Sequence, residues 1–100
     1  MGVREKKRYL LIEMTSEAKL DSKTAARLLN SALSEVYGES GLAKTSLKLI
    51  EFDETSQKAI AKVNLGFYRQ STAAFSLKRF FENKSVLLRV KKASGSVVKL

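Results

Sequence analysis

Three stretches of the chain alternate apolar and polar residues with a period of two, which is typical of β-strands that bury one face. In the first, Leu10, Ile12 and Met14 share one face, which predicts the core side of a strand. The polar segment DETSQ is short enough for a hairpin, so we expect its flanking strands to pair antiparallel. The predicted strands span residues 8–14, 44–53, 58–65 and, as a short apolar run that ends in two lysines, 85–92.

Between the first two strands the apolar spacing changes to three and four residues, which predicts an amphipathic helix. Its N-cap would be Asp21 or Ser22, whose side-chain oxygen can accept a backbone N–H. Gly38 would end the helix as a left-handed C-cap, because glycine adopts a positive φ without steric cost. The apolar stripe of this helix comprises Ala25, Leu28, Leu29, Ala32, Leu33 and Val36.

A second helix is predicted over about residues 68–81, again from apolar spacings of three and four. On this helix Phe75 falls on the outer arc, near Lys78 and Arg79, and would therefore be exposed. The arc that is expected to face the sheet comprises Ala73, Ala74, Leu77, Phe80 and Phe81.

The resulting element order, βαββαβ, predicts an α+β fold of the ferredoxin-like type. In that sandwich a four-stranded antiparallel sheet carries both helices on one face, and each β-α-β crossover is right-handed. A chain of 100 residues can build one core but not two, so we expect a single domain spanning residues 1–100.

The residue types that most often carry catalysis are missing from the sequence. It contains no histidine and no cysteine, which removes the common general base near neutral pH, the thiol nucleophile and the preferred zinc ligands. Asp53 and Glu54 are adjacent acids, but they lie in the predicted turn, where Asp commonly hydrogen-bonds to nearby backbone. The glycines are too far apart for a phosphate-binding loop. We therefore expect no catalytic residue, no metal and no cofactor in the chain itself.

Net positive charge is confined to the second half of the chain. Residues 1–54 carry nine basic and nine acidic side chains, whereas residues 55–100 carry ten basic ones and a single acid, Glu82. The whole net charge of +9 therefore lies in the second half. Such segregation favours an anionic partner, most commonly nucleic acid. With roughly six to eight phosphate contacts, the affinity would fall by a factor on the order of 10³ to 10⁵ between low and moderate salt.

Basic residues gather near both ends of the chain, and these are the strongest candidates for RNA contacts. We expect them to form two separate sites, with Arg8 near one edge of the sheet and Lys91 at the opposite edge. Further candidates lie on the third strand and around the second helix. The predicted RNA-binding residues are Arg4, Lys6, Lys7, Arg8, Lys58, Lys62, Arg69, Lys78, Arg79, Arg89, Lys91, Lys92 and Lys99.

The sheet face away from the helices is predicted to combine lysines with apolar side chains. An isolated domain seldom exposes such a patch, so this face favours a protein partner. Single-stranded RNA stacked on the sheet is the alternative, but Ile60 stands where that mode of binding needs an aromatic ring. The predicted protein-interface residues are Tyr9, Leu11, Ile50, Phe52, Ile60 and, on the second helix, Phe75.

Neither a membrane segment nor a secretory signal is predicted. No apolar run approaches the roughly eighteen residues that a membrane-spanning helix needs, and the N-terminal residues lack the apolar core of a signal peptide. We therefore expect a cytoplasmic protein without a membrane partner.

Five short segments, taken in order, carry a family resemblance: REKKRY at residues 4–9, GESGLAK at 38–44, FDETSQKAIAKV at 52–63, TAAFSL at 72–77 and ASGSVVK at 93–99. In this order and spacing they resemble the archaeal ribonuclease P protein component 2 family, relatives of the eukaryotic Pop-five subunit. The resemblance extends over nearly the whole chain. The closing segment departs from the family by reading Ser-Gly-Ser where Ser-Gly-Thr is usual.

The resemblance implies a non-catalytic, RNA-binding subunit that stabilises the catalytic RNA of ribonuclease P, the endoribonuclease that removes the 5′ leader from precursor tRNA. In that enzyme the RNA and its Mg²⁺ ions carry the chemistry. The implied partners are ribonuclease P RNA, the component 3 protein and other holoenzyme subunits, with precursor tRNA as the holoenzyme's substrate. A homodimer within a heterotetramer is compatible with the family. Two alternatives stay open: a ribosomal or other RNA-assembly protein of the same fold, and a dimeric regulatory domain that binds a small ligand.

Overall fold

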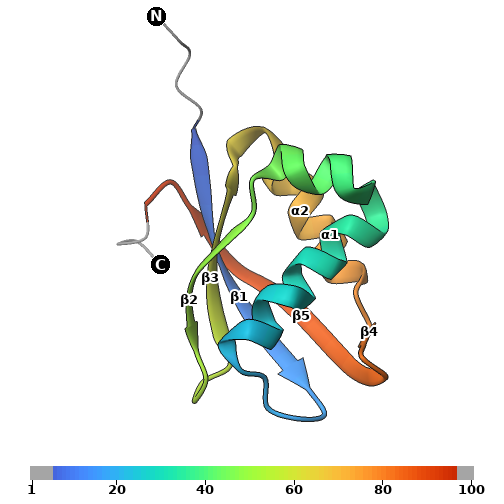
Figure 1. Ribbon diagram of the computed structural model, residues 1–100. Helices are drawn as coiled ribbons and strands as arrows, with labels where there is room; N and C mark the ends of the chain where they lie inside the picture. Colours follow the sequence, from blue (N-terminus) through green and yellow to red (C-terminus); the bar gives the residue numbers. More distant parts are fainter. Residues whose placement is uncertain (1–5, 97–100) are drawn as a thin grey trace, which may run out of the picture.

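An antiparallel sheet with both helices on one face makes up the computed structural model, which describes residues 6–96 (Figure 1). The strands lie in the order β2-β3-β1-β5-β4. The predicted α+β class, two helices and antiparallel sheet are confirmed, but the sheet has five strands instead of four. In chain order the elements are β1 (Lys7–Ser16), α1 (Ser22–Thr45), β2 (Lys48–Asp53), β3 (Lys58–Asn64), the 3-10 helix η1 (Leu65–Phe67), α2 (Tyr68–Leu77), β4 (Phe80–Phe81) and β5 (Lys84–Ser94).

The core lies between the sheet and the helices, where the sequence pattern places it. Burial alternates with a period of two along β1 and β3, as expected for strands that are covered on one side. Leu10, Ile12 and Met14 are buried, so the predicted core face of β1 is confirmed. The predicted stripe of α1 is buried at every position except Val36, which is 43% exposed.

Helix α1 continues past Gly38, where the sequence had predicted its end. Gly38 has the positive φ that was predicted (φ 73°, ψ 177°), but it forms a kink between two helical segments instead of a final cap. After the kink the helix changes direction (Figure 1) and brings Leu42 and Thr45 against the core. Although α1 has 24 residues, no helix within residues 6–96 is long and apolar enough to cross a membrane.

Helix α2 ends at Leu77, earlier than predicted, and buries a different face. Its inward residues are Ser71, Ala74 and Phe75, followed by Lys78 just beyond the helix. Phe75 is fully buried, so its predicted role as an exposed interface residue is wrong. Residues 80–81 form β4, which pairs with the start of β5 and leaves the predicted inward arc largely outside the core.

Strand β2 begins at Lys48 and contains a bulge that reverses the predicted orientation of its second half. The register passes from Leu49 opposite Ala61 to Glu51 opposite Ile60, so Ile50 has no partner in β3. One extra residue moves every later side chain to the other face of the sheet. Phe52 therefore packs against the core, and its predicted place on the open face is wrong.

Candidate nucleic-acid interface

The basic residues at the start of β1 and at the end of β5 lie at one end of the sheet. β1 and β5 are antiparallel neighbours, with Tyr9 opposite Ser94 and Leu11 opposite Lys92. The start of one strand must then lie beside the end of the other. The expected separation of Arg8 and Lys91 into two sites at opposite edges is therefore wrong, and the start of β1 and the end of β5 contribute to a single site.

Other elements bring further cations to this end. Lys62 of β3 lies opposite both Tyr9 and Lys48, and the Lys44 carbonyl accepts a 2.8 Å hydrogen bond from Asn64 Nδ2 at the end of β3. The Lys6 carbonyl accepts a 2.8 Å bond from the backbone N–H of Leu65. We call this cluster the basic end; it comprises Lys6, Lys7, Arg8, Lys44, Lys48, Lys62, Arg69, Lys91 and Lys92.

Lys44 and Lys48 were not among the predicted RNA-binding residues. Lys48 could have been found from the hairpin, because the register places it directly opposite Lys62. Lys44 could not, because it reaches the basic end only through the continuation of α1 beyond Gly38. Two of the predicted residues, Arg4 and Lys99, lie outside the described residues.

Charge is mixed at the opposite end of the sheet. Across the open face the register places Asp53 opposite Lys58, Lys58 opposite Glu13, and Glu13 opposite Arg89. Cross-strand neighbours of opposite charge attract one another and reduce the local field. Lys58 therefore lies between two carboxylates and Arg89 lies opposite one, away from the basic end, in contrast to Lys62 and Lys92.

Three exposed carboxylates at this mixed end accept backbone hydrogen bonds. The Ser85 N–H lowers the pKa of Glu17, and the Thr24 N–H lowers the pKa of Asp21. Asp21 thus caps α1, as predicted, through a 2.7 Å bond from Thr24 N to its Oδ1. The N–H groups of residues 56 and 55 lower the pKa of Asp53, which fits the turn role predicted for that residue. These acids remain charged and structural near neutral pH, because hydrogen bonds favour their ionised forms.

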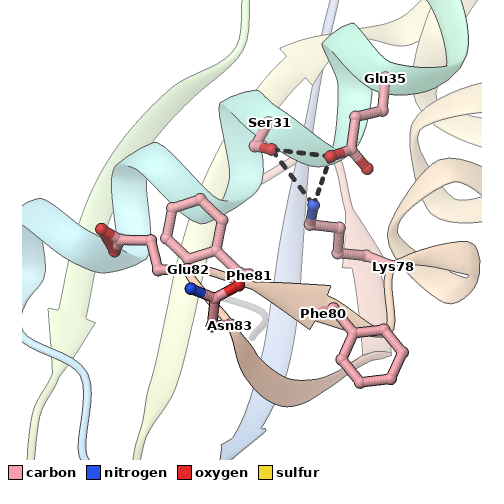
Figure 2. A pocket seen from close by; sticks show the side chains of 7 residues that line it. All are labelled: Ser31, Glu35, Lys78, Phe80, Phe81, Glu82 and Asn83. Carbon is pink, nitrogen blue, oxygen red and sulfur yellow. Dashed lines mark hydrogen bonds and ion pairs between the residues drawn. The ribbon is translucent and has the colours of Figure 1, made fainter.

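Lys78 is not available for RNA contact, contrary to prediction. Its side chain is only 5% exposed and points from the end of α2 toward α1 (Figure 2). Nζ donates hydrogen bonds to Glu35 Oε2 at 2.6 Å and to Ser31 Oγ at 3.2 Å. It also lies 5.5 Å from the centre of the Phe81 ring. A surrounding hollow of about 400 Å³ is lined by Ser31, Glu35, Lys78, Phe80, Phe81, Glu82 and Asn83.

The open face of the sheet retains four of the predicted interface residues. Tyr9, Leu11 and Ile60 are half-buried there, and Ile50 is exposed at the bulge. Lys62 and Lys92 border the same face through their pairing with β1. The lysines and the apolar residues therefore form one mixed surface, as the sequence pattern predicted.

The sequence pattern missed the two most exposed large apolar side chains among the described residues. Leu77 and Phe80 are each 67% exposed, and they lie on either side of Lys78 and Arg79. Figure 2 shows that Phe80 points away from the Lys78–Glu35 pair, whereas Phe81 points toward α1. The hydrophobic pattern could not reveal the exposure of Leu77 and Phe80, because it placed both residues on the inward arc of a longer helix. Arg79 is exposed beside them.

Fold and charge together define a small basic α+β protein with one strongly cationic end. Within residues 6–96, no three acidic, histidine or cysteine side chains come together as a site for a metal ion. The chain belongs to the Rpp14/Pop5 family, whose family model matches residues 8–100. The resemblance noted in the sequence is thus confirmed.

Named relatives agree with this assignment. The chain is 26% identical to "Ribonuclease P protein component 2" of Pyrococcus furiosus over 98 residues, which cover 98% of this chain and 82% of the relative. It is also 26% identical to "Ribonuclease P/MRP protein subunit POP5" of Schizosaccharomyces pombe, covering 97% and 81% of the two chains. A chain in the cryo-EM structure of yeast ribonuclease MRP shares the fold, with a TM-score of 0.76 and 18% identity over 96% of this chain and 79% of that one.

Proposed function

We propose that this protein is a non-catalytic subunit of ribonuclease P that binds the catalytic RNA through its basic end and stabilises the folded RNA. The observation that carries the proposal is the register of β1 and β5, because it gathers both basic termini of the sheet into one cationic cluster. The proposal names ribonuclease P RNA because relatives in the same family are named as subunits of ribonuclease P. The protein would thereby support endonucleolytic removal of the 5′ leader from precursor tRNA.

Phosphate neutralisation is the mechanism we infer for the basic end. Lysine and arginine side chains that approach RNA phosphates release bound counterions, which makes affinity fall steeply with salt. Such contacts also lower the repulsion between phosphate groups when RNA helices pack closely, an effect that Mg²⁺ otherwise provides. The chemistry of cleavage would belong to the RNA and its Mg²⁺ ions, which is in keeping with a chain that contains no histidine or cysteine.

The direct experiment is reconstitution of precursor-tRNA cleavage with the RNA and the other holoenzyme subunits, with and without this chain, at low Mg²⁺. We expect cleavage to need the chain at low Mg²⁺ and to need it less as Mg²⁺ rises. Cleavage that is independent of this chain at every Mg²⁺ concentration would refute the proposal. Copurification with ribosomal subunits in place of ribonuclease P RNA would favour a ribosomal or other RNA-assembly role. RNA binding that hardly depends on salt would favour the ligand-binding regulatory domain.

A matched pair of double variants tests which end of the sheet holds the RNA. Lys48→Gln with Lys62→Gln removes two charges from the basic end, whereas Lys23→Gln with Lys84→Gln removes two from the mixed end. The net charge falls equally in both. We expect the first pair alone to reduce the salt dependence of RNA affinity, by about 0.7 to 0.9 in log–log slope for each lost phosphate contact. Equal losses in both pairs would contradict a localised interface.

Docking on the component 3 protein is the second part of the proposal. Leu77 and Phe80 are suited to it, since both are exposed and apolar. Leu77 ends α2, whose start lies at the basic end, and Phe80 lies on the edge strand β4, so that protein and RNA would not compete. The open-face residues Leu11 and Ile50 form the other candidate surface. Copurification of component 3 with Leu77→Ser/Phe80→Ser and with Leu11→Ser/Ile50→Ser separates the two surfaces. If component 3 copurifies normally with both variants, docking through exposed apolar residues is contradicted.

A further inference from the structure

We propose that Arg8, Tyr68 and Arg69 form a clamp for one phosphate group at the basic end. This inference rests on the proposed function and adds a specific phosphodiester-binding site to it. The clamp lies where the start of β1 meets the start of α2, on the helix-covered side of the sheet. Its ligand would be a phosphodiester of the RNA backbone, recognised by two guanidinium groups.

Arg8 is placed at the margin of the core. It lies opposite Val63 in the β1–β3 register and shares the inward face with Leu10. Its guanidinium carbon is 5.5 Å from the centre of the Tyr68 ring. Its Nε is buried and has no hydrogen-bond partner among the described residues. An unpaired buried donor is unfavourable, and a phosphate oxygen that pairs with the guanidinium edge would relieve this.

Arg69 brings a second cation to the same ring. Its guanidinium carbon is 6.0 Å from the Tyr68 ring centre, and Tyr68 itself packs against the core. Within residues 6–96, no carboxylate lies at ion-pair distance from the guanidinium group of Arg8 or from that of Arg69. Two cations at one ring without a carboxylate partner among the described residues favour the binding of an anion, because an opposite charge stabilises both guanidinium groups. Because the ring is held by the core, it can keep both guanidinium groups in place before RNA arrives.

Gly95 lies beside the Arg8 guanidinium group. A Cβ atom built at Gly95 would lie 3.6 Å from Arg8 Nη1, which is ordinary van der Waals contact. A longer side chain at this position would therefore extend past the guanidinium. If that side chain carries a carboxylate, it can pair with Arg8 and occupy the anion site from within the protein.

The experiment compares Gly95→Glu with Gly95→Gln, which differ only in charge. The probe is the ribonuclease P RNA of the same organism, and Ala18→Glu serves as the control for net charge, since Ala18 is exposed beyond the far end of β1. We expect Gly95→Glu to weaken RNA binding by about tenfold, as for one lost charge-assisted contact. Gly95→Gln and Ala18→Glu should each stay within about threefold of the natural protein, which corresponds to less than about 0.7 kcal/mol.

Two further measurements keep the inference testable if binding falls for another reason. The Arg8 Nε–H resonance should shift when inorganic phosphate or a short RNA is added, and the shift should be lost in Arg69→Gln. Arg8→Lys keeps the charge but loses the planar fork, so it should bind RNA more weakly than the natural protein. Response to inorganic phosphate alone, without response to RNA, would overturn the assignment of the ligand as an RNA phosphodiester.

Failure of the clamp can be told apart from failure of the proposed function. If the natural protein binds the RNA with strong salt dependence but Gly95→Glu and Gly95→Gln bind alike, only the clamp is refuted. If the natural protein does not bind the RNA, the proposed function fails and the clamp fails with it.

Discussion

Phe75 is fully buried, whereas Phe80, only five positions later, is 67% exposed. The difference arises because α2 ends at Leu77 and the chain turns into β4 before Phe80. Phe75 therefore packs inside the core formed by both helices and the sheet, and Phe80 lies on the surface of an edge strand. The two residues provide a matched pair for testing which side of this segment stabilises the fold.

We expect Phe75→Ala to lower the free energy of unfolding by about 3–5 kcal/mol, since it removes a large buried side chain and leaves a cavity. Phe80→Ala should change it by less than about 0.5 kcal/mol, as is usual for exposed positions without special contacts. Chemical denaturation of both variants measures the difference. If Phe80→Ala were the more damaging change, the predicted helix over residues 68–81 would be a better description than the observed one.

This segment also shows what the sequence could not reveal. The inward positions around α2 include Ser71 and Lys78, so the hydrophobic pattern favoured another arc of the helix. Lys78 can be buried because its partner Glu35 lies on α1, 43 positions earlier in the chain. Helix and strand periodicities relate residues only a few positions apart, so they cannot predict that pairing. The bulge at Ile50 is similar, since one unpaired residue reversed the orientation of Phe52 without a glycine or proline to mark it.

Other features were readable because they depend on local chemistry. The period of two correctly predicted the buried face of β1, and the capping side chain of Asp21 correctly predicted the start of α1. The single basic end follows from strand order alone, because neighbouring antiparallel strands place the start of one beside the end of the other. The pairing of Leu11 with Lys92 shows this arrangement in the structure, and the expectation of two separate sites overlooked it.

The buried ion pair between Lys78 and Glu35 predicts a non-additive effect on stability. Glu35→Ala leaves the buried ammonium with Ser31 as its only hydrogen-bond partner among the described residues. We expect Glu35→Ala to lower the free energy of unfolding by about 1–2 kcal/mol. This is a small loss for an unpaired charge, because the Glu35 side chain is 58% exposed and water can take its place. Lys78→Met should lower the free energy of unfolding by less than about 1.5 kcal/mol, because methionine fills a similar volume without a charge.

A double-mutant cycle separates the pair interaction from packing. In the Lys78→Met background, Glu35→Ala should have little effect on the free energy of unfolding, since no ammonium is left without a partner. RNA affinity should be unchanged in Lys78→Met, because the ammonium is not exposed to RNA. A clear loss of RNA binding in this variant, with stability retained, would restore Lys78 as an RNA contact.

The kink in α1 predicts a specific requirement for glycine at position 38. Gly38 has φ 73° and ψ 177°, a combination that is essentially restricted to glycine. A Cβ at this position would meet no atom within 4 Å, so the cost of Gly38→Ala is backbone strain alone. We expect a loss of about 1–3 kcal/mol in the free energy of unfolding. Gly66→Ala is the matched control, because its Cβ also meets open space and its φ is not positive, and it should change stability by less than about 0.5 kcal/mol.

The cap of α1 predicts how stability depends on acid. The Thr24 backbone N–H lowers the pKa of Asp21 below its ordinary value of 3.8, so between these two pKa values the unfolded chain binds more protons than the folded one. The stabilisation is therefore fully present above pH 3.8 and is lost as the pH falls through the lower, folded-state pKa. Asparagine caps a helix about as well as aspartate but does not titrate. Asp21→Asn should thus unfold with a shallower dependence on pH below 4 than the natural protein, while the two remain similar at pH 7. Thermal unfolding between pH 2 and 7 measures this, with Ser22→Ala as an uncharged change at the same helix end that keeps the carboxylate. Identical acid profiles for Asp21→Asn and the natural protein would show that Asp21 does not contribute.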